Sequence, residues 1–129
     1  MATAEGLYYV GRSWSQTSDG VGDKEHKGIL VKFPLAGPTG PGVGGAEWVA
    51  SPNFFAYRGN ESFEAVAFGP GDALGSSHAL YATGRAQANG ANNAAILAKY
   101  DLAGKLLWSR ILGNTGWSMN SFGTGITVA

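Results

Sequence analysis

The chain contains the same series of short segments twice. "LYYVGR" at 7–12 returns as "LYATGR" at 80–85, and "ILVKFPLAG" at 29–37 returns as "ILAKYDLAG" at 96–104. A repeat within one chain indicates that one structural unit is built more than once, and it constrains the fold more than composition does.

Two further pairs of segments follow in the same order. "EWVAS" around Trp48 matches "LWSRI" around Trp108, and "SFEAVAF" at 62–68 matches "SFGTGITV" at 121–128 with one residue inserted. The connecting segments differ in length between the two copies, as loops do between repeated strands. The repeat therefore predicts eight short strands in two sets of four.

Helices are not expected in either copy. The best helical candidate, "NNAAILAKYDLAGKLL" at 92–107, is interrupted by Asp101 and Gly104, and its counterpart carries Pro34 where a helix would be broken. The chain also has 21 Gly, four Trp, five Tyr and six Phe, a composition typical of short strands joined by tight turns. The predicted fold class is all-β, built as propeller blades or a small sandwich.

Composition excludes several function classes. Nine basic and nine acidic side chains cancel in 129 residues, which argues against nucleic-acid binding and against a polybasic membrane anchor. No apolar run approaches the roughly 20 residues that span a bilayer, and "MATAEG" does not resemble a signal peptide. The absence of cysteine excludes disulfides, thiolate zinc sites and a cysteine nucleophile.

The second copy resembles a bacterial β-propeller repeat often called SBBP. It reads "LYATGR… AILAKYDLAGKLLWSRILG… GITVA", where the family has a "VYVTG" strand, an "AFVAKLDxxGxLLWSxxLGG" hairpin and a "GIAVD" inner strand. The first copy departs from this pattern at Pro34 and through the insertion "PTGPGVGG" in its hairpin turn. The resemblance implies two four-stranded propeller-type blades, and it favours the cell surface or the exterior as the location.

The blades are circularly offset along a single domain, 1–129. One is expected to comprise about 7–61 completed by a C-terminal strand at 121–129, and the other about 62–113. Because propellers have about four to eight blades, two cannot close a ring alone. We therefore expect the C-terminal strand to complete a blade of a neighbouring subunit in a homo-oligomeric ring, with a trimer favoured. The residues expected in this assembly are Leu7, Tyr9, Phe122, Ile126 and Val128.

Two other arrangements remain open from the sequence. In the first arrangement, the chain is a fragment of a longer propeller. In the second it is a self-contained eight-stranded sandwich whose terminal strands pair within one chain. The unpaired edges of an isolated two-blade chain would favour aggregation, which argues against a lone monomer.

No metal, cofactor or catalytic site is expected. The acidic loop "SDGVGDKEH" holds Asp19, Asp23 and Glu25, but its spacing differs from a calcium-binding loop and its lysines offset the charge. The two histidines, His26 and His78, lie in different blades.

The carboxylates offer no repeated pair either. Glu61 and Glu64 flank or lie on an inner strand, so that Glu64 is placed to face a central channel, but the second copy has no matching pair.

Aromatic and hydrogen-bonding side chains on loops are the better candidates for ligand binding. Saccharides stack on aromatic rings. Their hydroxyls accept hydrogen bonds from arginines and amides and donate them to acids and amides. Trp48 and Trp108 are expected to fill the space between blades. The candidate ligand-binding residues are Trp14, Trp117, Arg12, Arg85, Tyr57 and Arg58, of which the two arginines 12 and 85 are equivalent in the two copies.

The sequence thus predicts a non-enzymatic binding or assembly module, with a glycan or a protein as partner. The alternative is a purely structural subunit of a larger complex, and an enzyme is the least supported reading.

Overall fold

The structure is a computed structural model that describes residues 1–16, 24–37, 39–41, 44–51, 60–87, 93–112 and 123–128. Of residues 14–16, 24 and 25 it describes the backbone alone. The described residues form eight strands: β1 (Ala2–Thr3), β2 (Gly6–Gln16), β3 (Lys24–Phe33), β4 (Trp48–Ala50), β5 (Asn60–Pro70), β6 (His78–Gln87), β7 (Ala94–Tyr100) and β8 (Leu106–Leu112).

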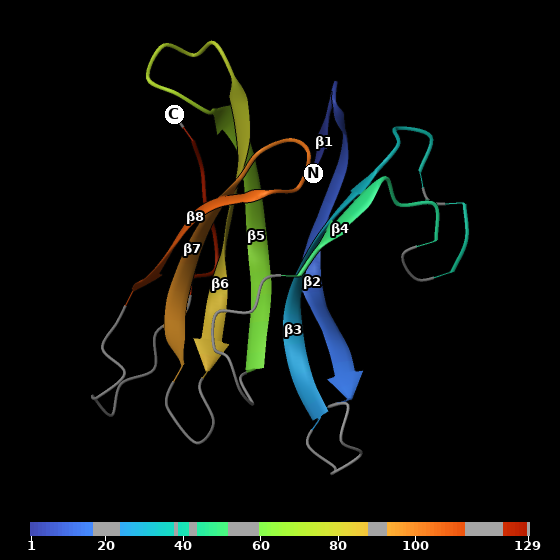
Figure 1. Ribbon diagram of the computed structural model, residues 1–129, viewed down its shortest axis with the longest axis vertical. Helices are drawn as coiled ribbons and strands as arrows, with labels where there is room; N and C mark the ends of the chain where they lie inside the picture. The colour runs from blue at the N-terminus through green and yellow to red at the C-terminus, as the bar shows by residue number, and fades with distance from the viewer. Residues whose placement is uncertain are drawn as a thin grey trace.

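The strands form two four-stranded antiparallel sheets, which confirms the predicted all-β class. The first sheet has the order β1-β2-β3-β4, and the second has the order β5-β6-β7-β8. Figure 1 shows the sheets side by side, with β5 next to β2 and β3. The described residues include no helix that could cross a membrane.

The two copies of the sequence repeat have the same strand register. Tyr8 lies opposite Lys32 in the first sheet, as Tyr81 lies opposite Lys99 in the second. The next strand continues the match, because Lys32 pairs with Trp48 and Lys99 pairs with Trp108. Residues that align in the sequence therefore occupy equivalent places in the two sheets.

The sheets pack face to face around one hydrophobic core. Successive side chains of a strand point to opposite faces, so Tyr8 and Leu30 lie on one face of the first sheet together with Trp48. This inner face contacts β5, and it forms one buried cluster with Phe63 and side chains of β6 and β7. Gly28 lies against the Phe63 ring, and a Cβ there would stand 3.4 Å from it. The buried side chains of this core are Tyr8, Leu30, Phe63, Leu80, Ala82, Ala86, Ile96, Ala98 and Tyr100.

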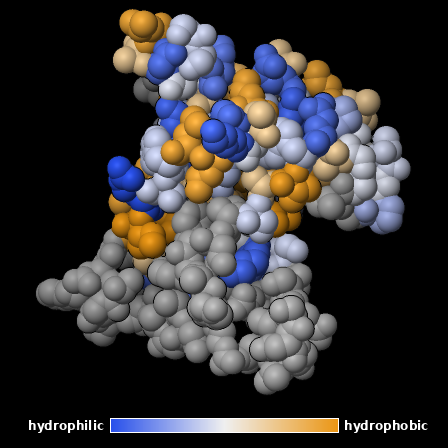
Figure 2. All heavy atoms as spheres, in the orientation of Figure 1, coloured by the Kyte–Doolittle hydropathy of each residue, from blue (hydrophilic) through white to orange (hydrophobic). Residues whose placement is uncertain are grey.

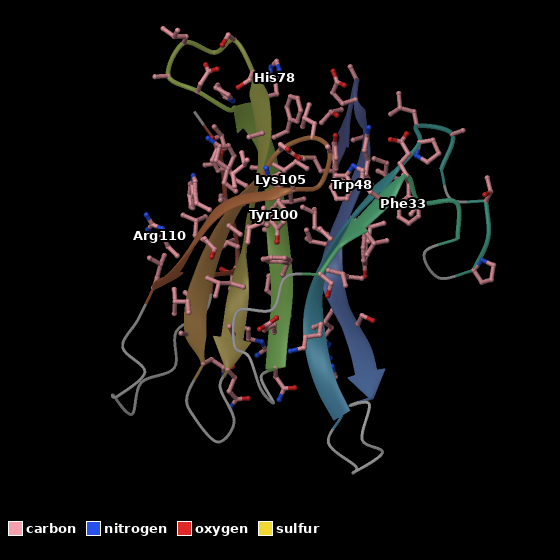
Figure 3. The ribbon with its side chains drawn as sticks, viewed as in Figure 1. Phe33, Trp48, His78, Tyr100, Lys105 and Arg110 are labelled. Atoms are coloured by element: carbon pink, nitrogen blue, oxygen red, sulfur yellow. The ribbon has the colours of Figure 1, made fainter. Side chains whose placement is uncertain are left out.

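Trp48 joins the first sheet to the turn between β7 and β8. Its indole Nε1–H donates to the carbonyl of Leu102 at 3.1 Å, and its ring lies against Gly104. Figure 3 shows Trp48, the first residue of β4, beside this turn. Trp48 fills space between the two sheets, as expected, whereas Trp108 lies on the opposite face of the second sheet, against Tyr81.

The strand beside β2 at the edge of the first sheet differs from the sequence expectation. Within the chain this place belongs to β1, whose two residues pair with Gly6 and Leu7. The described part of the C-terminal segment, 123–128, is not a strand, although a strand was expected at 121–129. That strand was expected to pair with a neighbouring subunit, so the exchange itself stays a prediction.

The C-terminal segment lies against the second sheet. The amide of Gly123 donates to the carbonyl of Gly84 at 2.9 Å, and the side chain of Val128 covers Gly69. The segment borders Tyr81 and Trp108, on the face of the second sheet that points away from the first.

A pair of matched glycines tests the packing around Trp48. Gly37 and Gly104 have φ angles of 86° and 85°. Among the described residues, a Cβ at Gly37 would meet no atom within 4 Å, whereas one at Gly104 would meet the Trp48 ring at 2.8 Å. We expect Gly37→Ala to lower the unfolding free energy by about 1 kcal/mol through backbone strain, and Gly104→Ala by about 2–4 kcal/mol because overpacking is added. Urea unfolding of dilute protein measures both, and equal losses would contradict the packing described.

Candidate functional site

Arg12 and Arg85 come together between the two sheets. Arg12 lies on β2 after Gly11, and Arg85 lies on β6 after the equivalent Gly84. Both side chains line one hollow of about 310 Å³ along the inner edge of the sheets. We call it the arginine groove; its lining residues are Tyr9, Gly11, Arg12, Ser62, Phe63, Glu64 and Arg85.

A short polar network forms one wall of the arginine groove. The hydroxyl of Ser62 donates to Oε1 of Glu64 at 2.7 Å, and Nε of Arg85 donates to the Ser62 hydroxyl at 3.3 Å. Arg85 Nε also lies 3.9 Å from Glu64 Oε1. The pairing of β5 with β6 shifts register between Phe63 and Ala65, and this bulge gives Glu64 its place beside Arg85.

An exposed aromatic ring forms another part of the wall. Tyr9 is 52% exposed although it lies within β2. Its ring lies over Gly11, where an added Cβ would come within 2.7 Å of the Tyr9 hydroxyl. Gly11 therefore gives the ring room to lie along the groove.

A smaller hollow adjoins the arginine groove, and Arg12, Ser62 and Arg85 line both. Glu61 lines the smaller hollow and is only 1% exposed. Burial raises the pKa of the neighbouring Tyr100 hydroxyl, and the negative charge of Glu61 raises it further. The site thus places a buried carboxylate and an exposed one, Glu64, on the same strand β5.

His26 lines the same smaller hollow, and its backbone N–H donates to Oδ1 of Asn60 at 3.1 Å. Desolvation lowers the pKa of the His26 imidazole, and the positive charges of Arg12 and Arg85 lower it further. The imidazole is consequently held neutral at pH values where an exposed histidine would begin to ionise.

These groups suit a hydroxyl-rich ligand. Guanidinium groups supply donors in a fixed planar arrangement, carboxylates supply acceptors, and an exposed aromatic ring offers an apolar face. Among the described residues, no three His, Cys, Asp or Glu side chains are grouped as metal ligands would be.

The structure brings together part of the predicted site. Arg12 and Arg85 meet in one groove, and Tyr9, expected in subunit assembly, lines it with them. His78 stacks on Phe68 at 4.9 Å, apart from the groove. The remaining candidates lie outside the described residues, or, for Trp14 and Glu25, have no described side chain: Trp14, Asp19, Asp23, Glu25, Tyr57, Arg58, Trp117 and Phe122.

The other assembly residues lie on both sheets. Leu7 pairs with Ala2 and Phe33 in the first sheet. Ile126 and Val128 border a hollow on the second sheet.

Sequence reasoning missed Ser62, Glu61 and His26 as neighbours of the arginines. The bulge in β5 and the contact between β3 and β5 bring them there, and both are tertiary features without a local signal. Glu64 lines the arginine groove, whereas the central channel that it was expected to face belongs to the predicted ring and stays a prediction.

No protein-family model matches this chain, and no curated protein matches it either. The resemblance to the bacterial β-propeller repeat therefore stays a prediction.

The electrostatic link between the arginines and His26 can be measured directly. We expect Arg12→Gln and Arg85→Gln each to raise the pKa of His26, because each removes a positive charge that disfavours the imidazolium. An NMR titration of the imidazole measures this shift, with Arg110→Gln as control since Arg110 contacts the Trp108 ring instead. An unchanged pKa in both variants would mean that the arginines do not converge on His26.

Proposed function

We propose that this protein is a non-enzymatic binding and assembly module whose arginine groove binds a saccharide. The observation that carries the proposal is the meeting of Arg12 and Arg85, equivalent residues of the two repeats, in one groove with an exposed Tyr9 ring. The resemblance to propeller repeats and the saccharide ligand together favour a cell-surface or extracellular location.

The chemistry of the groove supports a neutral sugar. Its two guanidinium groups are balanced by the carboxylates of Glu61 and Glu64, so a strongly charged ligand would meet no excess of opposite charge. Sugar hydroxyls both donate and accept hydrogen bonds, and they therefore suit arginine and glutamate side by side. The apolar face of a pyranose ring fits against an exposed tyrosine.

A glycan array followed by titration of the best ligand tests the binding role. Loss of Arg85 or of the Tyr9 ring is expected to weaken binding by about 10- to 100-fold, as for a hydrogen bond to a charged group or a stacked ring. Arg110→Ala, on the far strand β8, should bind as the parent does. Trp14→Ala and Trp117→Ala extend the test to the predicted loop residues. Binding that survives both Tyr9→Ala and Arg85→Ala would contradict the groove as the site.

The assembly role is supported by the difference in length between the edge strands β1 and β5. β5 pairs with β6 along its length, from Asn60 to Pro70, whereas β1 pairs only with Gly6 and Leu7 of β2 and Met1 adds hydrogen bonds to Tyr8. A strand from a neighbouring copy, 121–128, would complete the first sheet along β2 and so link the chains head to tail. Val128 would then meet Leu7, displacing β1. Three chains would close a ring of six blades.

The solution mass of the full chain and of a chain ending at Asn120 tests this exchange. We expect the mass of the full chain in solution to be an integer multiple, two or higher, of the 13.3 kDa monomer mass. The shortened chain should dissociate to monomers because it lacks the exchanged strand. Light scattering after size exclusion gives both masses. The exchange would be contradicted if the full chain and the shortened chain were both folded monomers.

A purely structural subunit is the second candidate function. It is favoured by the identical register of the two sheets, since a repeated unit is suited to stacking whether or not it binds a ligand. Silence across a broad glycan array, together with firm self-association, would favour this role over saccharide binding.

A further inference from the structure

The second sheet presents an apolar face that the first sheet does not cover. Tyr81, Leu97 and Trp108 lie on this open face and line a hollow of about 510 Å³ with Leu112 and the C-terminal segment. Leu112 of β8 is 50% exposed on this face, and Figure 2 shows hydrophobic side chains at the surface near the end of this strand. Tyr81, Leu97 and Trp108 are only half-buried, and apolar groups left partly in water on one face indicate an interaction surface.

The equivalent face of the first sheet is already packed within the chain. Tyr8, Leu30 and Trp48 align with Tyr81, Leu97 and Trp108 in sequence and in register. Even the aromatic pairs correspond, because the ring centroids of Tyr8 and Trp48 are 6.1 Å apart and those of Tyr81 and Trp108 are 6.5 Å apart. The open face thus carries the same groups that hold the two sheets together.

The turn that the inner face of the first sheet contacts also occurs twice in the chain. Trp48 packs on the turn at Leu102 and Gly104, and this turn corresponds to the one at Leu35 and Gly37. The two turns share one backbone form: Gly104 donates to Asp101 and Gly37 donates to Pro34, at 3.1 and 2.8 Å. Yet Leu35 is 62% exposed, and in the part of the chain that the structure describes nothing lies within 4 Å of a Cβ at Gly37.

We propose that the open face of the second sheet binds a second copy of this chain, with Trp108 packed over the turn at Leu35 and Gly37 of that copy. This inference rests on the proposed assembly and names the surfaces that meet in it. The contact repeats the one between the two sheets of a single chain, so its two sides are different and it continues head to tail.

The C-terminal segment has a place consistent with this docking. Its sequence at 121–128 matches that of β5, and 123–128 lies on the second sheet as β5 lies on the first. The segment covers the side of the open face near Gly69 and Thr83. The segment therefore lies where one edge of the neighbour's first sheet would lie in the proposed docking.

Complementary variants test this docking. Trp108→Ala removes one side of the contact, and Leu35→Asp places a charge on the other. Each variant alone is expected to lose self-association by about thirtyfold or more. Mixed in equal amounts, the two should form a dimer of twice the 13.3 kDa monomer mass, because one intact side remains on each. Leu74→Asp is the control, since Leu74 is 91% exposed in the turn between β5 and β6.

Sedimentation over a range of concentrations measures association, and circular dichroism checks that each variant is folded. Gly37→Ala serves as a second variant, because a Cβ there would obstruct Trp108 of the neighbour. Retention of the parent mass by Leu35→Asp and Gly37→Ala, or a mixture that stays monomeric, would overturn the docking. A full chain that dissociates on truncation but not on Leu35→Asp would overturn this inference alone. A monomeric full chain would overturn the proposed assembly as well.

Discussion

The packing of the first sheet's inner face onto the second sheet is the interaction on which the rest of the molecule depends. Tyr8 and Leu30 close the core from one side, and the Trp48 indole fixes the outer strands through its hydrogen bond to Leu102. An isolated four-stranded sheet would leave one apolar face in water, so each sheet requires a layer against it. The same packing brings the edge of β2 beside β5, and this proximity places Arg12 and Arg85 in one groove. The candidate binding site is therefore a product of how the sheets meet.

The repeat explains why the chain carries unfinished surfaces at both ends. Each sheet carries both surfaces of the contact between the sheets, so packing the two sheets together uses one surface of each. The surface with Tyr81 and Trp108 and the turn with Leu35 and Gly37 remain without a counterpart. In a symmetric two-fold dimer the same patch would meet itself, whereas here two different patches correspond to two halves of an existing contact. The short β1 adds an unfinished strand edge on β2. A head-to-tail arrangement would satisfy both features at once.

The fold could be predicted from the sequence because the repeat is visible locally. Aligned residues such as Tyr8 and Tyr81 proved to share one register, and Pro34 had already excluded a helix. The position of the C-terminal segment could not be foreseen in the same way, because a match to β5 says what the segment resembles and not which sheet it contacts. The groove was only half predictable. Arg12 and Arg85 stood out as equivalent, while Ser62 and Glu64 reach them through a bulge whose position depends on the pairing of β5 with β6.

The most direct test of this account is residue-resolved hydrogen exchange of the full chain as a function of protein concentration. We predict that amides of β2 on the edge away from β3 become more protected as the concentration rises. The turn at Leu35 and Gly37 should follow them, whereas the central strand β7 should exchange at a constant rate because both its neighbours lie in the same chain. Protection that is independent of concentration at both places would contradict head-to-tail assembly.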